Sequence, residues 1–591
     1  MAEDQQALFQ QAMNRHQAND LPAAEALYRD ALAADPHNLD IQYLLGTALL
    51  QQSRFRDAAN LLQKVTVARP DVPDAHNNLG VAYKALGEWE PAMRAFQAAI
   101  KANPEYSQAF FNLGAVMDER RLPADAEKCY EKGLELAPGD KQMRVALAEA
   151  LGRQQKWEAA EACYRQLSAD EPDNPDLQVR LGFVLVRQDR LDEAIEQFQK
   201  VLIAKPDYHE IHNNLGYIYE RQGRLDEAVA ASERALELYP DYAEGHNNLG
   251  TALKSLSRLD EACDSFRQAL VLLPDFPLAE FNLGTTLLLQ GDLAAGWPGY
   301  DRRGDTLDVP PVTYGKPRWD GSPLDGRTIL LAAEQGLGDT IQFIRYAPLI
   351  QQTAGRVILH CPRPLAKLLD GCGGIDQLIV KDDELPDFDI EAPLLSLPRI
   401  LETTTETIPA DVPYLTADEK LVARWQKWRA NIDGFTVGIC WQGNRDYPRD
   451  SERSPQLATF APLAAILGVK LVSLQKGEGC EQISEVEFDV VQPGDDFDGT
   501  TGAFMDTAAL MKNLDLVVTS DTAIPHLAGA LGVPVWVALP FLPDWRWMLD
   551  REDSPWYPSM RLFRQPTAGD WETPFANIAT ALQDLVNNTA Q

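Results

Sequence analysis

Apolar side chains recur at helical spacing through the first half of the chain. Within residues 215–236 they are Leu215, Tyr219, Leu225, Ala228, Val229, Ala235 and Leu236. Intervals of three, four and seven residues place such positions on one helix face. The segment is therefore predicted to form two amphipathic helices joined by a turn.

This pattern returns every 34 residues. Three series keep the period: Pro36, Pro70, Pro104, Pro138, Pro172, Pro206, Pro240 and Pro274; Ala24, Ala58, Ala92, Ala126, Ala160, Ala194, Ala228 and Ala262; and Gly46, Gly80, Gly114, Ala148, Gly182, Gly216, Gly250 and Gly284. Small residues allow two helices to cross closely, because a bulky side chain would push their axes apart. Proline after the second helix cannot continue it and sets the turn. We predict an array of helix–turn–helix units.

A 34-residue unit with blocks such as Asn214-Leu215-Gly216 and Arg224-Leu225-Asp226-Glu227-Ala228 resembles the tetratricopeptide repeat. The resemblance implies an all-α superhelix over residues 1–297, as eight repeats and a truncated ninth. Residues 298–326, rich in Pro, Gly and aromatic residues, are predicted to form a packed linker.

From residue 327 onward, short apolar runs alternate with helical patterns. The predicted strands are 328–333, 357–360, 377–380, 390–395, 437–441, 470–474, 516–519 and 535–539. Such alternation predicts an α/β region with parallel sheets and right-handed crossovers, in two successive Rossmann-type halves. The halves are placed at 327–415 and 416–591. Ligands of such sheets bind beyond the carboxyl ends of the strands.

Composition excludes some classes of partner and indicates a cellular compartment. The 591 residues carry a formal net charge of -34, which argues against nucleic acid or an anionic membrane as partner. No apolar run is long enough for a membrane span. Seven cysteines without a CxxC pair, and an N-terminus unlike a signal peptide, lead us to expect a cytoplasmic protein.

One predicted strand end carries the sequence Ser520 to Gly532, which includes Asp521, Thr522, Ala523 and His526. Ser, Asp and Thr can cap the following helix, whose free N–H groups attract an anion. His526, one turn inside, could donate to a phosphate oxygen. Asp521 is expected to hold the loop or to bind a sugar hydroxyl. A well-capped helix without a ligand explains the same pattern.

The motif Asp521-Thr522-Ala523-x-x-His526-Leu527-Ala528 with Gly532-x-Pro534 resembles the donor-binding motif of heptosyltransferase-like glycosyltransferases, which have the GT-B fold. Residues 318–321, 333–340 and 543–558 look like bacterial proteins that fuse tetratricopeptide repeats to such a domain. The resemblance covers about 297–565. It implies that Thr522, Ala523 and His526 contact the donor nucleotide.

A second loop, Gly336-Leu337-Gly338-Asp339-Thr340, follows the first predicted strand. Gly336 and Gly338 would let the backbone approach a donor closely. In the resembling enzymes the aspartate of this turn is the general base, which here would be Asp339 acting on an acceptor hydroxyl. An aspartate that only caps the helix is the alternative.

Cations gather in a third loop. Asn444, Arg445, Arg449 and Arg453 follow the strand predicted at 437–441, and Lys476 follows the next one. Arginine pairs bidentately with phosphate, so the loop is a candidate pyrophosphate clamp. Similar enzymes place a cation here, usually lysine, which leaves Arg445 and Arg453 both open. A solvated surface loop is the alternative.

No metal or cofactor is expected. The DxD pattern of metal-dependent sugar transferases occurs at 387–389 and 496–498, but a chain with 88 acidic residues is expected to contain such matches by chance. No His/Cys cluster has the spacing of a zinc site. The nucleotide sugar would be a co-substrate.

Asparagine precedes the repeat glycine at Asn78, Asn112, Asn214, Asn248 and Asn282. An amide both donates and accepts, so a row of asparagines can bind an extended peptide backbone. The row resembles the asparagine ladder of the eukaryotic O-linked N-acetylglucosamine transferase. Asparagine being common there in this repeat family is the alternative.

Together these features predict a metal-independent glycosyltransferase that transfers a sugar from a nucleotide donor to Ser or Thr of a protein held by the repeats. Flagellin is an acceptor suggested by resemblance alone. The alternatives are a repeat scaffold or chaperone with a degenerate transferase domain, and a transferase acting on a lipid or glycan.

The asparagine hypothesis gives a first prediction. Replacing Asn214 and Asn248 together by Ala should weaken binding of an acceptor protein and leave binding of the donor nucleotide intact, because only the backbone-binding amides are removed. Calorimetry with acceptor and donor in separate titrations measures both. Unchanged acceptor affinity would exclude the ladder.

Overall fold

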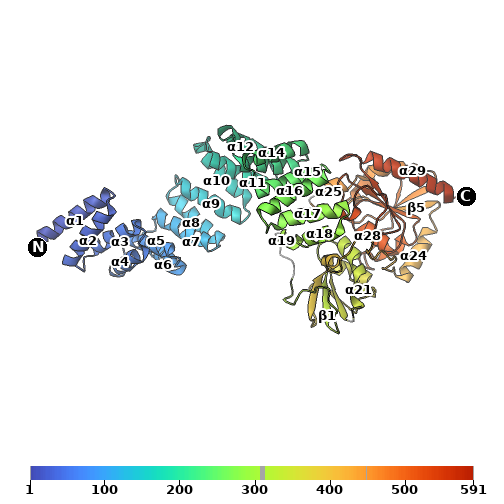
Figure 1. Cartoon of the computed structure of the whole chain (residues 1–591), viewed down its shortest axis with the longest axis horizontal. Coiled ribbons are helices and arrows are strands. Elements are labelled where there is room, and N and C mark those ends of the chain that lie inside the picture. The colour runs from blue at the N-terminus through green and yellow to red at the C-terminus, as the bar shows by residue number, and fades with distance from the viewer. Residues whose placement is uncertain (1, 307–312, 354, 448, 590–591) are drawn as a thin grey trace. The chain divides into compact units, whose positions relative to one another are not determined.

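The computed structural model describes residues 2–306, 313–353, 355–447 and 449–589 (Figure 1). The chain divides into two compact units, residues 1–218 and 219–591. Each unit is described by itself.

Paired helices make up the first unit and continue into the second. In order they are α1 (Ala2–Gln17), α2 (Leu21–Ala34), α3 (Leu39–Gln51), α4 (Phe55–Ala68), α5 (Pro73–Ala85), α6 (Trp89–Ala102), α7 (Ser107–Glu119), α8 (Pro123–Leu136), α9 (Lys141–Arg153), α10 (Trp157–Asp170), α11 (Pro175–Arg187), α12 (Leu191–Ala204) and α13 (His209–Arg221). The second unit adds α14 (Leu225–Leu238), α15 (Ala243–Ser255), α16 (Leu259–Leu272), α17 (Pro277–Gln290), α18 (Leu293–Tyr300) and α19 (Arg303–Thr306). These pairs confirm the predicted helix–turn–helix repeats.

The repeat glycines make room for an aromatic ring of the following helix. A Cβ added to Gly80 would lie 2.5 Å from Phe96, and one added to Gly182 would lie 2.5 Å from Phe198. Gly114 and Gly250 face Tyr130 and Phe266 in the same way. The alanine of each second helix is buried from Ala24 to Ala262. The small residues therefore serve helix packing as predicted, but a ring fills the space that the glycine leaves.

Neighbouring repeats are joined by a recurring polar contact. Glu161 of α10 accepts hydrogen bonds from Arg190 at 2.7 Å and from Gln188 at 2.8 Å, both of the next repeat. Glu127 is bound in the same way by Lys156 and Gln154. Hydrogen bonds from these partners keep the pKa of both glutamates below its ordinary value although burial raises it.

The last helix pair crosses with backbone against backbone. A Cβ on Gly284 of α17 would lie 2.6 Å from the Tyr300 nitrogen and 2.7 Å from the Gly296 oxygen. One on Gly299 would lie 2.3 Å from the Glu280 oxygen. Glycines on both helices permit this approach, and α18 is only 8 residues long.

Two parallel sheets follow, one yellow-green and one orange to red in Figure 1. The four-stranded sheet has the order β3-β2-β1-β4, and the six-stranded sheet has the order β10-β9-β8-β5-β6-β7. Their strands are β1 (Thr328–Ala332), β2 (Arg356–Cys361), β3 (Gln377–Val380), β4 (Ile390–Pro393), β5 (Phe435–Cys440), β6 (Val469–Ser473), β7 (Val490–Val491), β8 (Leu516–Thr519), β9 (Val535–Leu539) and β10 (Met560–Arg564).

Helices connect the strands, and the 18-residue α29 follows the last strand. They are α20 (Leu337–Phe343), α21 (Ala347–Gln351), α22 (Ala366–Leu369), α23 (Leu397–Ile400), α24 (Glu419–Arg429), α25 (Asp450–Arg453), α26 (Ala461–Ala464), α27 (Met505–Met511), α28 (Ala523–Ala530) and α29 (Glu572–Thr589). The connections also contain short 3-10 helices: η1 (Ile344–Tyr346), η2 (Arg363–Leu365), η3 (Leu394–Ser396), η4 (Leu457–Phe460), η5 (Cys480–Glu485) and, after β9, η6 (Trp545–Trp547).

Parallel pairing confirms the predicted α/β region. Eight strands lie where the apolar runs predicted them, whereas β7 and β10 were not predicted. The run predicted as a strand over 390–395 ends at Pro393 and turns into a 3-10 helix. The domain boundaries at 297, 326 and 415 stay predictions.

Tryptophans anchor the predicted linker, residues 298–326: Trp297 directly precedes it and Trp319 lies within it. Trp297 is buried and its indole donates to the Thr403 carbonyl at 2.7 Å. Trp319 is also buried, and its backbone nitrogen donates to Glu391 at 2.9 Å. Residues 307–312 of the predicted linker lie outside the described residues. In the described part of the chain no helix is both long and apolar enough to cross a lipid bilayer.

The crossing of α17 and α18 gives a prediction. Gly284→Ala should lower the free energy of unfolding by about 1–3 kcal/mol, because backbone atoms of α18 must move to admit the methyl group. Urea denaturation followed by circular dichroism measures the change. Gly152→Ala is the matched control, since its nearest atom is 3.5 Å away, and it should be neutral or stabilise by up to about 1 kcal/mol. Equal effects of both substitutions would contradict the packing argument.

Candidate active site

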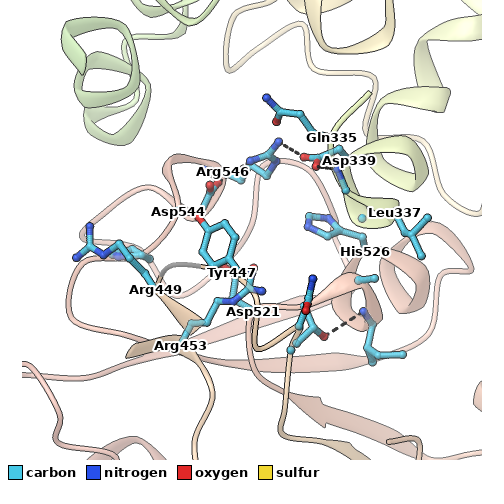
Figure 2. Close-up of a pocket in the computed structure, with 18 of the residues that line it drawn as sticks. Gln335, Leu337, Asp339, Tyr447, Arg449, Arg453, Asp521, His526, Asp544 and Arg546 are labelled. Carbon is cyan, nitrogen blue, oxygen red and sulfur yellow. Dashed lines mark hydrogen bonds and ion pairs between the residues drawn. The ribbon is translucent and has the colours of Figure 1, made fainter. Parts of the chain in front are cut away.

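A cavity of about 1010 Å³ lies at the carboxyl ends of parallel strands in the second unit (Figure 2). Loops after β1, β5, β6, β8 and β9 form most of its wall, as expected for α/β sheets. The segment from β7 into α27 also contributes, and α15, α17 and α18 add the side chains of Lys254, Phe281, Asn282, Thr285, Leu289 and Tyr300. Pockets that hold small molecules have volumes of roughly 300–1,000 Å³. The cavity is large enough for a nucleotide sugar.

The helix α28 points its first turn into this cavity. Thr522 is the N-cap and its hydroxyl accepts from the Ile524 nitrogen at 3.2 Å. Thr522, Ala523 and His526 all line the cavity. Of the Ser, Asp and Thr residues predicted to cap this helix, Thr522 forms the cap. The first turn of α28 therefore lies at the carboxyl end of β8.

His526 is buried and held on both sides. Its ring stacks on Trp547 with centroids 5.2 Å apart, and its Nδ1 lies 3.0 Å from the Tyr557 hydroxyl. Burial lowers the pKa of His526 well below its ordinary value, and nearby Arg546 and Arg345 lower it further. His526 is therefore a neutral imidazole.

The Tyr557 hydroxyl decides which nitrogen carries the proton. Burial raises the pKa of Tyr557 well above its ordinary value, so the hydroxyl keeps its hydrogen. We assign this hydrogen to a bond with Nδ1, because Nδ1 lies 3.0 Å from the hydroxyl whereas its other contact, with the Tyr414 hydroxyl, is longer at 3.5 Å. Nε2 of His526 then carries the N–H, and among the described residues it has no hydrogen-bond partner. His526 can donate one hydrogen bond to a ligand.

Asp339 lies at the third position of α20 and has two partners. One carboxylate oxygen accepts from the Gly336 nitrogen at 2.8 Å, and the other pairs with Arg546 (Figure 2). Burial raises the pKa of Asp339, while Arg546 and the Gly336 N–H act in the opposite direction. The aspartate therefore caps its helix and also forms part of a buried ion pair, so the two sequence interpretations are compatible.

Arg546 of η6 holds the centre of the site. Its guanidinium donates to Asp544 at 2.8 Å and to Gln342 at 2.6 Å, and it stacks on Trp545 at 4.4 Å. Burial alone would lower the pKa of Arg546, but Asp544 and Asp339 raise it well above its ordinary value. Arg546 and Asp544 were not predicted as site residues. Their position directly after β9 is the signal that could have found them.

Asp521 lies beside this ion pair. Burial, reinforced by Asp544, raises its pKa to about 6, and Arg453 opposes the rise. Asp521 lines the cavity but is an unfavourable neighbour for a phosphate when it is ionised.

The arginine loop after β5 divides into two parts. Asn444, Arg449 and Arg453 line the cavity, and the Arg453 guanidinium lies 4.2 Å from the Tyr447 ring. Arg445 pairs instead with the exposed Glu481 and does not line the cavity. Of the two arginines left open by the sequence, the structure brings only Arg453 to the site.

Lys476 and the two glycines of the β1–α20 loop also reach the cavity. Lys476 lines it and donates to the Phe497 carbonyl at 2.6 Å. A Cβ on Gly338 would lie 3.0 Å from the His526 ring and 3.4 Å from the Ala523 Cα. Gly338 therefore allows α20 to pack against the first turn of α28, and Gly336 supplies the N–H that Asp339 accepts.

Of the predicted acceptor-binding asparagines, the cavity includes only Asn282. Asn282 donates to Asn247 of the preceding repeat at 2.9 Å, and Asn112 donates to Asn77 at 2.8 Å. Asn78 donates to Thr47 at 3.3 Å. Asn214 and Asn248 are half-buried and do not line the cavity. The amide N–H groups of this row thus also connect repeats.

The two DxD matches have structural roles. Asp498 accepts from the Thr507 nitrogen of α27 at 3.2 Å, and Asp389 accepts from the Thr328 nitrogen of β1 at 2.7 Å. Within the described ranges no group of three or more His, Cys, Asp or Glu side chains could hold a metal ion.

Comparison with known proteins identifies the helical region. Models of the tetratricopeptide repeat match residues 15–77, 73–106, 145–209, 184–243 and 243–274. Protein FlbA of Caulobacter vibrioides is 29% identical over 332 residues, which cover 51% of this chain and 54% of that protein. The chain thus spans about half the length of this relative.

Solved structures resemble parts of the chain. The MamA protein is 25% identical, with a TM-score of 0.28, over 29% of this chain and 94% of that one. A tetratricopeptide repeat protein from Parabacteroides merdae is 18% identical, with a TM-score of 0.32, over 42% of this chain and 99% of that one. The helical region of this protein consists of tetratricopeptide repeats.

Proposed function

We propose that this protein is a glycosyltransferase that moves a sugar from a nucleotide donor to a Ser or Thr hydroxyl of a protein bound by its repeats. The observation that carries the proposal is the composition of one cavity wall. Asp339, the first turn of α28 with His526, and side chains of the last repeat helices all line the same cavity.

The α28 end of the cavity suits the phosphates of the donor. Free N–H groups and the positive end of a helix dipole attract anions. The Nε2–H that we assign to His526 adds a neutral donor, and Arg453 and Lys476 add positive charge. These groups would stabilise the leaving nucleotide without a metal ion.

Asp339 is the proposed general base. Its carboxylate takes the proton of the acceptor hydroxyl while the hydroxyl oxygen attacks the anomeric carbon of the sugar. The bond between that carbon and the phosphate oxygen breaks, and the electron pair leaves with the nucleotide. The ion pair with Arg546 favours the ionised form of Asp339 and orients its carboxylate before the reaction. The acceptor hydroxyl becomes more acidic in the transition state, and its proton then moves to Asp339.

The repeats would supply the acceptor. Asn282 belongs to the asparagine row and also lines the cavity, so an acceptor chain held along α15 and α17 would end beside the reacting groups. Holding the two substrates on one molecule raises their effective concentration and lowers the entropic cost of the reaction. The two parallel sheets are compatible with a GT-B arrangement in which the four-stranded sheet is a short first half.

One observation favours a second candidate, a repeat scaffold without transferase activity. Both carboxylate oxygens of Asp339 already accept from Gly336 and Arg546. An aspartate with these partners can be purely structural. The experiment below separates the two candidates.

Asp339→Asn tests the base. The full chain is incubated with acceptor protein and UDP-, GDP-, CMP- and dTDP-sugars, and the acceptor is weighed by mass spectrometry. Native protein should add a sugar. Asp339→Asn should lower turnover about 10²- to 10⁴-fold while nucleotide affinity remains, because Asn keeps the cap but cannot take a proton.

Asp418→Asn is the control. Asp418 caps α24 outside the cavity, so this substitution should leave sugar transfer unchanged. Full activity of Asp339→Asn would remove Asp339 as the base. No sugar transfer and no nucleotide binding by native protein would favour the scaffold.

Asp521 predicts a pH dependence of donor binding. Its pKa of about 6 means that it is mostly ionised at pH 7.5 and mostly protonated at pH 5.5. Loss of this negative charge should tighten binding of a nucleotide sugar about three- to tenfold as the pH falls. Calorimetry at both pH values measures the change, because the phosphodiester groups of the donor do not titrate in this range. Asp521→Asn should bind equally at both, and a native profile identical to that of the variant would contradict the assignment.

A further inference from the structure

A lysine of the repeats reaches the cavity of the α/β region. Lys254, in the last turn of α15, is the only lysine between residues 219 and 300. It lines the cavity together with Asn282 and Thr285 of α17. Its Nζ donates to the Thr285 hydroxyl at 2.8 Å, and that hydroxyl donates to the Asn282 carbonyl at 3.1 Å. Thr285 thus fixes the direction of the Lys254 side chain.

Lys254 lacks the carboxylate partner that each of three arginines lining the cavity has. Arg546 pairs with Asp339 and Asp544, Arg453 with Asp450, and Arg449 with Glu452. Among the described residues no carboxylate lies within 4.0 Å of Lys254 Nζ. An ammonium group has three N–H donors, and the Thr285 hydroxyl takes one of them. The other two are available to a ligand.

The surroundings of Lys254 favour an anion. Burial and, after it, the positive charge of Arg449 lower its pKa to about 8, against the opposing effects of Asp544, Cys263 and Glu220. Two cations from different elements, α15 and the loop after β5, therefore repel each other across the cavity wall. An anion bound between them would attract both cations and offset their mutual repulsion.

We infer that Lys254 is a binding residue for the phosphate groups of the proposed nucleotide-sugar donor, supplied to the transferase cavity by the repeat helices. The inference rests on the proposed function and extends it. Lys254 and Arg449 would then bind the donor phosphates in the cavity that the first turn of α28 also lines. The repeats would then hold the donor as well as the acceptor, and a chain without α15 would bind nucleotide weakly.

A basic residue in the last turn of a helix also stabilises the helix dipole, and this role needs no ligand. The two roles differ in what they predict. A dipole contact affects stability alone, whereas a phosphate contact affects nucleotide affinity and its dependence on pH.

The test uses the full chain and calorimetry with UDP, GDP, ADP, dTDP and CMP, continued with whichever nucleotide the native protein binds most tightly. Lys254→Gln should raise the Kd of that nucleotide about 10- to 100-fold, the value of a hydrogen bond to a charged group. Lys200→Gln, an exposed lysine of α12, is the matched control and should leave the Kd unchanged.

Lys254→Arg provides the readout that a structural role would not give. Native affinity should fall about tenfold between pH 7 and pH 9, because Lys254 loses its proton through a pKa of about 8. Arginine stays protonated, so Lys254→Arg should bind with nearly native affinity at pH 7 and show no such fall.

Two outcomes would overturn the inference, and they differ. If Lys254→Gln binds nucleotide as tightly as native protein while His526→Ala loses binding, Lys254 is not a ligand residue and the proposed function stands. If native protein binds none of the five nucleotides, both the inference and the proposed function fail. An equal fall in affinity from pH 7 to 9 for native protein and Lys254→Arg would also exclude the phosphate contact.

Discussion

The buried guanidinium of Arg546 is the interaction on which the cavity depends. It joins Asp339 of the β1–α20 loop to Asp544 after β9, and Gln342 of α20 accepts from its Nε. A buried charge without partners costs several kcal/mol, so Arg546 depends on its two carboxylate partners together. The loops of the two sheets are thereby held in one arrangement around the cavity, and the ionised form of Asp339 is stabilised at the same time.

Aromatic packing extends this arrangement to the repeats. Trp545, which lies under the Arg546 guanidinium, packs edge-on against Trp297 and Tyr300 of α18 with ring centroids 5.2 Å from each. The glycines that bring α17 and α18 into backbone contact position Tyr300 for this packing. The last repeat is therefore part of the cavity wall, which gives the fusion of repeats and α/β region a physical role in the proposed reaction.

Much of the fold could be predicted because local rules decide it. The 34-residue series of Gly, Ala and Pro identifies the helix pairs, and apolar runs bounded by turns locate strands such as 377–380 and 516–519. The strand β10 was missed because Arg561 and Arg564 interrupt its apolar pattern at the edge of the sheet. The two-residue β7 is too short for any periodicity.

By itself, the sequence determined that helical repeats precede parallel sheets, and that Asp339, Thr522 and His526 stand at strand ends, because periodicity and capping act over a few residues. Tertiary structure decided the rest. It turned Arg445 toward Glu481, placed Arg546 against Asp339 across 207 residues of sequence, and carried Lys254 from a repeat helix into the cavity. Contacts of that kind depend on which surfaces pack together, and no spacing along the chain encodes them.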